Sequence, residues 1–157
     1  MADKSKKGMV FAPFTFEVEK GKIAEFAMAV SQAQSKAQVK PIYVDANAAK
    51  AAGYGDIVPP PTFQNSFSNW SGEGIIPKLE ELNINIGRML HGEEEYEYFA
   101  LIHPGDVITG TSRVADVYEK EKKGKPGKFM EFTVFETELK NQHGELVIRS
   151  RSILVER

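Results

Sequence analysis

The chain has no cysteine, one tryptophan and three histidines among its 157 residues. The lack of cysteine excludes disulfides, thiolate nucleophiles and cysteine-ligated zinc or iron–sulfur sites. No apolar run approaches the length of a membrane-spanning helix, and the polar, lysine-rich start over residues 1–8 has no apolar core of signal-peptide length. We therefore expect a cytoplasmic protein with no membrane partner.

The sequence also lacks a strong charge of either sign, since the net charge is −2. With 41% hydrophobic and 27% charged residues, the composition is that of an ordinary soluble globular protein. The one lysine-dense stretch, residues 120–128, has lysines interleaved with Glu119 and Glu121 and is typical of a solvated hairpin tip. These features indicate no nucleic-acid partner.

The length fits one domain with a single hydrophobic core. No internal repeat or second linker divides the chain. We predict a disordered tail over residues 1–10 and a single domain over residues 11–157.

Periodicity in the first part of the chain predicts a strand followed by two helices. Apolar and polar residues alternate over 14–19, and an apolar stripe at helical spacing runs through 22–32. Asp45 is suited to cap a short alanine-rich helix, and Gly53 is suited to its left-handed end.

Three prolines and Thr62 then form a stiff entry into a third helix. Phe63, Phe67 and Trp70 follow at i, i+4 and i+7 and lie on one face of that helix. Such an aromatic stripe is far more often core than ligand site, so we expect this helix to be buried against a sheet.

The second half of the chain predicts four long strands, over 93–102, 107–118, 129–139 and 146–155. Because short turns join them, we expect sequence neighbours to pair antiparallel, as a four-strand meander. The predicted fold class is therefore α+β, a hot-dog fold in which an antiparallel sheet wraps around one central helix.

Several segments carry a resemblance in their order and spacing. They are Phe14 to Val30, Lys40 to Asp45, Ala48 to Gly53, Val58 to Phe63, His91 to Tyr98, and Pro104 to Asp106. From about Phe14 to Val155 the chain resembles the MaoC-like hydratase/dehydratase family, and especially its N-terminal-type dehydratase domains. The resemblance implies the hot-dog fold, an enoyl-thioester or 3-hydroxyacyl-thioester substrate and a role in fatty acid metabolism.

Active members of that family carry the motif Asp-x-Asn-Pro-(Leu/Ile)-His, in which Asp and His activate water. Aligning the motif on Pro41 places Gln38 at the Asp position, Lys40 at the Asn position and Tyr43 at the His position. Glutamine cannot act as a base, and a phenol is a poor base near neutral pH. By the family mechanism, this chain should not catalyse hydration on its own.

The family's other catalytic device is a backbone N–H at the start of the central helix, which polarises the thioester carbonyl. The resemblance places these amides near Thr62 and Phe63, and the expected substrate-binding residues are Pro60, Thr62, Phe63, Phe67 and Trp70. An alternative is that the three prolines merely fix the start of the helix.

His91 lies at the start of a strand and could project into a cavity, although an isolated strand histidine is more often structural or solvated. The three histidines are dispersed without metal-ligand spacing, so we predict no metal and no cofactor. A hot-dog thioesterase would need a carboxylate on or facing the central helix. Gln64 and Asn65 occupy that region, and Glu73 falls near its end, which gives this alternative little support.

Two functional hypotheses remain. In the first, the chain is a non-catalytic subunit that binds an acyl-CoA or acyl-ACP thioester and pairs with a homologous chain carrying the Asp/His motif. In the second, it is an active homodimeric hydratase or dehydratase in which His91 or Tyr43 has taken over proton transfer. In both, the resemblance implies a homodimer or heterodimer with a continuous sheet.

Overall fold

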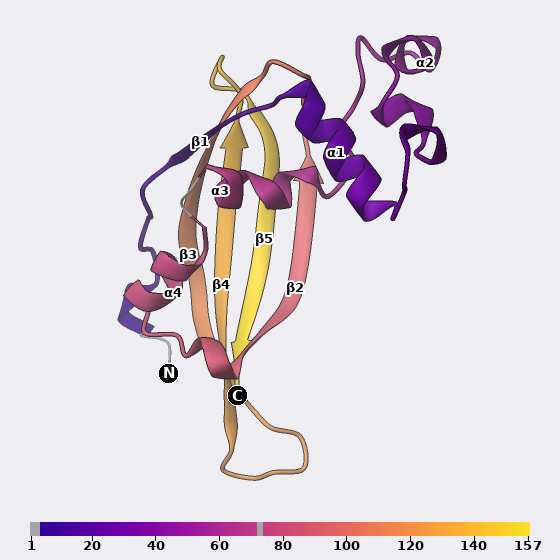
Figure 1. Cartoon of the computed structure of the whole chain (residues 1–157). Coiled ribbons are helices and arrows are strands. Elements are labelled where there is room, and N and C mark those ends of the chain that lie inside the picture. The colour runs from indigo at the N-terminus through magenta and orange to yellow at the C-terminus, as the bar shows by residue number, and fades with distance from the viewer. Residues whose placement is uncertain (1–3, 72–73) are drawn as a thin grey trace.

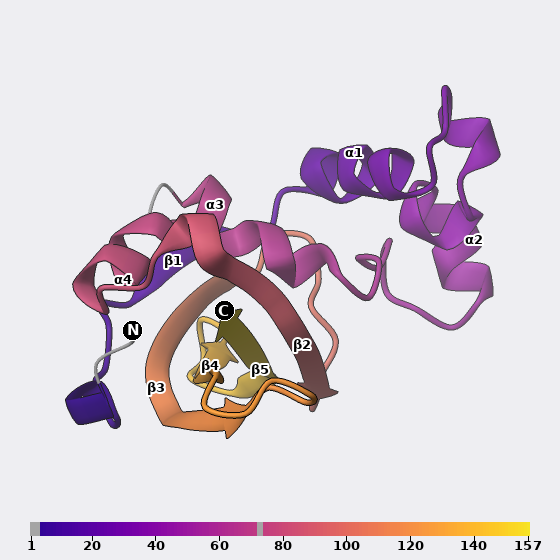
Figure 2. The same cartoon turned by 90° about the horizontal axis from the view of Figure 1, so that it is seen from below.

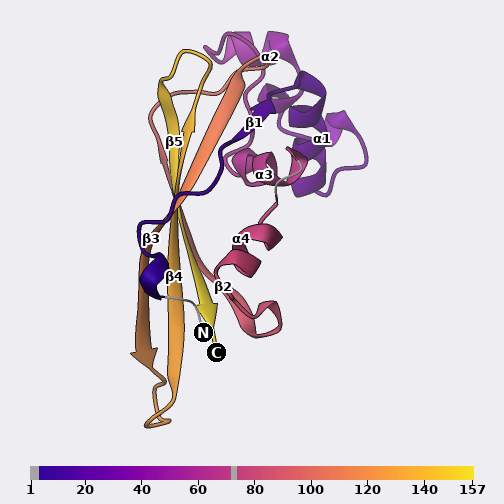
Figure 3. The same cartoon turned by 90° about the vertical axis from the view of Figure 1, so that its left-hand side faces the viewer.

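The computed structural model describes residues 4–71 and 74–157, which form a five-stranded antiparallel sheet and four short helices (Figure 1). The sheet order is β1-β3-β4-β5-β2. Its strands are β1 (Phe14–Glu17), β2 (Met89–Tyr98), β3 (Val107–Glu121), β4 (Phe129–Lys140) and β5 (Leu146–Glu156). The helices are α1 (Lys20–Val30), α2 (Ala46–Ala51), α3 (Phe67–Trp70) and α4 (Ile76–Glu81). Figure 3 shows these helices on one side of the sheet, so the predicted α+β hot-dog class is confirmed.

The central segment crosses the inner face of the sheet, the face that carries the helices (Figure 1). It starts with a 3-10 turn, Phe63–Ser66, and continues as α3. Phe63 and Phe67 are fully buried, and the Phe67 ring stacks on Phe16 with their centroids 4.5 Å apart. The predicted third helix is thus present and buried, but as two short pieces.

The local signals around α2 are confirmed. The Asp45 side chain accepts hydrogen bonds from the backbone N–H groups of Asn47, at 2.8 Å, and Ala48, at 3.4 Å. Gly53 has a φ of +92°, the left-handed conformation that glycine adopts without steric cost. Two further 3-10 turns, Lys36–Gln38 and Pro41–Tyr43, connect α1 to α2.

The predicted four-strand meander is wrong at its first strand. Strands β3, β4 and β5 do pair in sequence order, but β2 pairs with β5, from Met89 opposite Glu156 to Tyr98 opposite Ile148. The start of β3 pairs with β1 instead. Strand β2 also ends four residues earlier than predicted, at Tyr98. Residues 99–106 then run from the β2 edge of the sheet to the start of β3 (Figure 2).

The described part of the expected N-terminal tail makes ordered contacts along β3. Lys4–Lys6 form a 3-10 turn, the Gly8 N–H donates to the Val114 carbonyl at 2.8 Å, and Val10 forms an isolated bridge with Arg113. Strand β1 pairs only with the first residues of β3, Val107 to Gly110. The backbone N–H and C=O groups on that edge of β3 after Gly110 are therefore open to other partners. Backbone hydrogen bonds of Gly8, Met9 and Phe11 with Ser112 and Val114 therefore extend the sheet edge beyond β1. The disordered tail over residues 1–10 stays a prediction.

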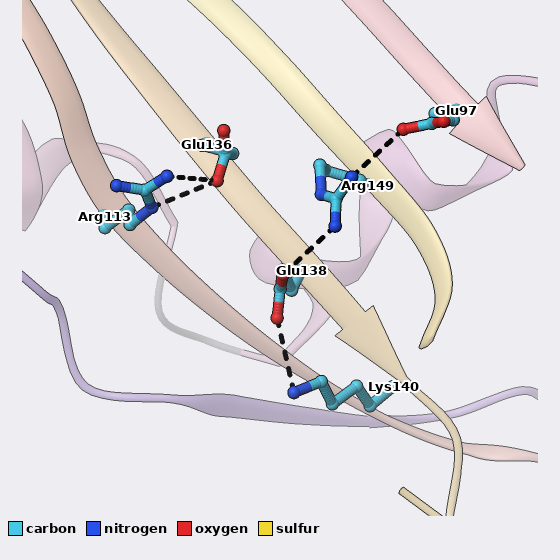
Figure 4. A network of polar contacts seen from close by, with 6 residues as sticks. All are labelled: Glu97, Arg113, Glu136, Glu138, Lys140 and Arg149. Carbon is cyan, nitrogen blue, oxygen red and sulfur yellow. Dashed lines mark hydrogen bonds and ion pairs between the residues drawn. The ribbon is translucent and has the colours of Figure 1, made fainter. Parts of the chain in front are cut away.

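The outer face of the sheet carries a row of ion pairs (Figure 4). Arg149 contacts Glu97 at 3.2 Å and Glu138 at 3.5 Å, Glu138 contacts Lys140 at 3.3 Å, and Arg113 contacts Glu136 at 2.6 Å. Such exposed pairs contribute little stability, but they mark this face as solvated. None of the helices in the described residues has the length and apolar content needed to cross a bilayer.

Candidate functional site

A largely apolar pocket of about 470 Å³ lies beyond the end of β2, where the residues after β2 approach the start of the central segment. We call it the apolar pocket. The residues that line it are Lys40, Ile42, Tyr43, Tyr54, Val58, Pro59, Pro60, Pro61, Phe63, Gln64, Tyr98, Phe99, Ala100, Leu101, Ile102 and Ile148. A concave apolar site with a few polar groups is the usual form of a small-molecule site.

The structure brings three of the expected site residues together in this pocket, namely Tyr43, Pro60 and Phe63. Lys40, at the motif's Asn position, also lines the pocket. Gln38, at the Asp position, lies outside the described lining, and its side-chain oxygen accepts from the Gln34 backbone N–H at 2.7 Å. The pocket therefore contains the aligned Asn and His positions without a carboxylate at the Asp position.

The remaining expected residues lie outside the lining of the apolar pocket. Thr62 is exposed, Phe67 is buried in the core, and Trp70 packs its ring against Phe16, Phe26 and Phe63 with 44% of its surface exposed. These aromatic contacts agree with the core interpretation of the stripe.

The expected carbonyl-polarising amide at Phe63 is already used. The Phe63 N–H donates to the Pro60 carbonyl at 3.0 Å within the 3-10 turn. The proline entry thus fixes the turn geometry and engages the Phe63 amide, which is the second backbone N–H after Pro61, following that of Thr62.

Sequence reasoning missed the wall of the pocket contributed by Tyr98 and the residues after it. The Tyr98 hydroxyl donates to the Pro61 carbonyl, and the Gln64 amide donates to Pro61 O and to the Tyr98 hydroxyl, both at 2.9 Å. Burial raises the pKa of Tyr98, so this phenol stays protonated near neutral pH. The missed signal was the unbroken apolar run over 98–102, which does not alternate as a half-buried strand should.

A second pocket of about 240 Å³ lies between the inner face of the sheet, the central segment and α4. We call it the polar pocket for its hydroxyl, amide, imidazole and carboxylate groups, although Phe14, Ile75, Phe135 and Leu139 also line it. His91, Glu94 and Tyr96 of β2 line it, and His91 Nε2 lies 3.0 Å from Glu94 Oε2. Burial and the neighbouring Glu94 carboxylate raise the pKa of Tyr96, whose hydroxyl donates to Asn65 Oδ1. His91 therefore does project into a cavity, but not into the one that Tyr43 lines.

Residues 4–71 and 74–157 contain no group of three or more histidines and carboxylates arranged to hold a metal ion. Glu73, considered as a thioesterase carboxylate, lies outside the described residues.

Comparison with known proteins supports one family. The model of the FAS1-like dehydratase domain region matches residues 5–150. A UPF0336 protein of Streptomyces griseus is 31% identical over 156 residues, which are 99% of this chain and 95% of the relative.

Several solved structures are similar in fold, and two of them illustrate the likeness. One is the C-terminally truncated HadBC (3R-hydroxyacyl-ACP dehydratase) complex from Mycobacterium tuberculosis, with a TM-score of 0.74, 20% identity and 96% of both chains covered. The other is a MaoC-like dehydratase, with a TM-score of 0.74, 21% identity, and 98% of this chain and 42% of that one covered. The chain therefore has the hot-dog fold of these dehydratases and belongs to the FAS1-like dehydratase-region family, among the UPF0336 proteins.

Proposed function

We propose that this chain is the acyl-thioester-binding subunit of a 3-hydroxyacyl-thioester dehydratase or enoyl-thioester hydratase, and that a homologous partner chain supplies the Asp/His pair. The apolar pocket carries the proposal, because it can hold an acyl chain while Lys40 and Tyr43 stand at the aligned Asn and His positions. The likeness to the HadBC complex supports assembly of two hot-dog chains.

The binding half of the proposal is tested by filling the apolar pocket. Ala100 is an exposed alanine of the pocket lining, so Ala100→Trp fills the pocket with little disturbance of the core. We expect this change to weaken binding of octanoyl-CoA, measured by calorimetry, at least about tenfold, which is about 1.4 kcal/mol. Ala51→Trp, on the exposed surface of α2, is the matched control and should bind as the unaltered chain does. Equal affinity in both variants would place the acyl chain elsewhere.

The catalytic half is tested by assaying hydration of crotonyl-CoA and longer enoyl-CoA. The chain alone should be inert, because no acid–base pair occupies the motif positions, and activity should appear when a homologous Asp/His-bearing chain is added. The active-homodimer alternative is favoured by one observation, the His91–Glu94 pair in the polar pocket. Turnover by the lone chain that disappears in His91→Ala or Tyr43→Phe would establish that alternative and contradict our proposal.

A further inference from the structure

Three glutamates lie side by side on adjacent strands, at the end of the sheet opposite to the apolar pocket. Glu119 of β3 lies opposite Glu131 of β4, and Glu131 lies opposite Glu156 of β5. Glu131 is four residues before Phe135, whose side chain packs in the core, so the row lies on the inner face of the sheet. Figure 1 shows this end of the sheet beside the C-terminus, away from α1 and α2. Like charges directly opposite one another destabilise a sheet, so the row has a cost.

Two of these carboxylates are almost completely buried. Glu131 is 5% exposed and Glu156 is 7% exposed. The Asn85 backbone N–H donates to Glu156 Oε2 at 3.3 Å. Within residues 4–71 and 74–157, by contrast, no group donates a hydrogen bond to Glu131 Oε2. Buried charged groups in native proteins are paired or hydrogen-bonded, so this oxygen points to a partner from outside the chain.

The row of glutamates faces a pocket of about 340 Å³, which we call the acidic pocket. The residues that line it are Arg88, Glu119, Phe129, Glu131 and Glu156. None of these residues lines the apolar pocket or the polar pocket. The acidic pocket is therefore a separate concavity, in which a ligand can reach Glu131.

The basic groups near the acidic pocket already have other partners. Arg88 Nε donates to the Arg157 backbone carbonyl, and Lys4 Nζ lies 2.9 Å from Glu119 Oε2. Neither contact includes Glu131. The uncompensated negative charge therefore lies at the buried centre of the row, and the matching ligand is a cation.

The groups in the lining favour an organic cation over a metal ion. No three carboxylates or histidines of the described residues are arranged to hold a metal, and the positive charge of Arg88 lies in the lining. A guanidinium has five N–H donors in one plane and can donate to two neighbouring carboxylates, whereas an ammonium group is a point charge with three donors. Phe129, which is 54% exposed, offers a ring against which an alkyl stem or a guanidinium can pack.

We propose that the acidic pocket binds the guanidinium group of a ligand, with Glu131 as its principal ion-pair partner and Glu156 beside it. The site is independent of the proposed acyl-thioester function, because it shares no lining residue with the apolar pocket. A guanidinium occurs both in free alkylguanidines and in the arginine side chains of other proteins, so the test includes a probe for each source.

The test titrates the isotope-labelled full chain with n-butylguanidine and with the peptide acetyl-Gly-Arg-Gly-amide, and follows backbone amide signals by NMR. We expect shifts at residues 119, 129–131 and 156. Glu131→Gln removes the charge at almost constant shape and should weaken binding at least about tenfold. Glu95→Gln is the matched control, because Glu95 of β2 is exposed and lies outside the lining of all three pockets. Its affinity should stay within about twofold.

Two further titrations test the shape of the ligand site. Phe129→Ala leaves the buried carboxylates in place, because Phe129 is exposed, and should weaken binding about threefold. The probe n-butylamine, which carries an ammonium group on the same stem, should bind the unaltered chain at least about threefold more weakly than n-butylguanidine.

The outcomes separate the two sources of the guanidinium. Binding of n-butylguanidine at least as tight as that of the peptide identifies a free small cation as the ligand, whereas tighter binding of the peptide identifies an arginine side chain of a partner. Four results would overturn the proposal: no binding of either probe, binding insensitive to Glu131→Gln, equal affinity for n-butylamine, or the same shifts produced by magnesium or calcium chloride alone.

Discussion

At the scale of single residues, glycine is required where atoms of a neighbouring strand leave no room for a Cβ atom. An added Cβ would lie 2.8 Å from Val155 Cγ2 at Gly92 of β2, and it would clash with the ring of Phe14 at Gly110 of β3. Gly55, by contrast, has nothing within 4 Å of such a Cβ and no positive φ. Replacement of glycine by a larger residue should therefore be costly at Gly92 and Gly110 but not at Gly55.

This contrast gives a stability prediction. Gly92→Ala should lower the free energy of unfolding by about 1–3 kcal/mol, the usual cost of inserting a methyl group into a tightly packed position. Gly55→Ala should leave it unchanged or slightly raised, because alanine restricts the unfolded chain. Urea denaturation of both variants measures the difference. If the two variants are equally stable, β2 can accept a side chain at position 92 and glycine is not required there.

At the scale of elements, one ion pair ties the start of α1 to the segment leading into the proline entry. Lys20 Nζ lies 2.6 Å from Asp56 Oδ1, which also accepts from the Ile57 backbone N–H at 2.7 Å. These two hydrogen bonds, that of Lys20 first, hold the pKa of Asp56 below its ordinary value of 3.8. The contact is exposed, but it links α1 to the segment that leads into the proline wall of the apolar pocket.

The lowered pKa predicts a pH dependence with a definite sign. Folded Asp56 binds its proton more weakly than the unfolded chain does, so its contribution to stability is present above pH about 4 and is lost as the pH falls through the folded-state pKa. Asp56→Asn should therefore lower the thermal midpoint at pH 7 and have a smaller effect at pH 3. Lys20→Met is the control and should reproduce the loss at pH 7. If Asp56→Asn lowers the thermal midpoint equally at pH 7 and pH 3, the ion pair is excluded as the cause.

At the scale of the whole molecule, strand β2 forms one edge of the sheet (Figure 1). It is ten residues long, and an edge of that length presents backbone donors and acceptors that another chain can pair with. Apolar side chains continue from its end, since Phe99 is 48% and Leu101 54% exposed. The charged outer face shown in Figure 4 is less suited to burial, so we place the proposed subunit contact at the β2 edge.

The double variant Phe99→Asp/Leu101→Asp tests this placement. Two carboxylates in an apolar contact should weaken association with a homologous Asp/His-bearing chain at least about tenfold, as measured by analytical ultracentrifugation. Val30→Asp is the control, because Val30 at the end of α1 is also 54% exposed. Undiminished association of the double variant would move the contact to another surface.

The sequence alone determined the features that depend on local spacing. Alternation located strands β1 and β3 to β5, the Asp45 cap and Gly53 bounded α2, and the aromatic spacing identified the buried central segment. The predictions from periodicity are correct because the spacing of apolar residues along a strand or helix decides which of its faces can be buried. The family motif likewise located Tyr43 and Lys40, which line the apolar pocket.

Only the tertiary structure decided which distant segments meet. Periodicity states which face of a strand is buried but not which strand lies beside it, so the pairing of β2 with β5 could not be derived from the sequence. A β-bulge at Gly92 shifts that period by one residue and brings His91 and Glu94 onto one face, against the expectation for a regular strand. The polar and apolar pockets arise from contacts between segments remote in the chain, where long-range packing rather than local preference sets the geometry.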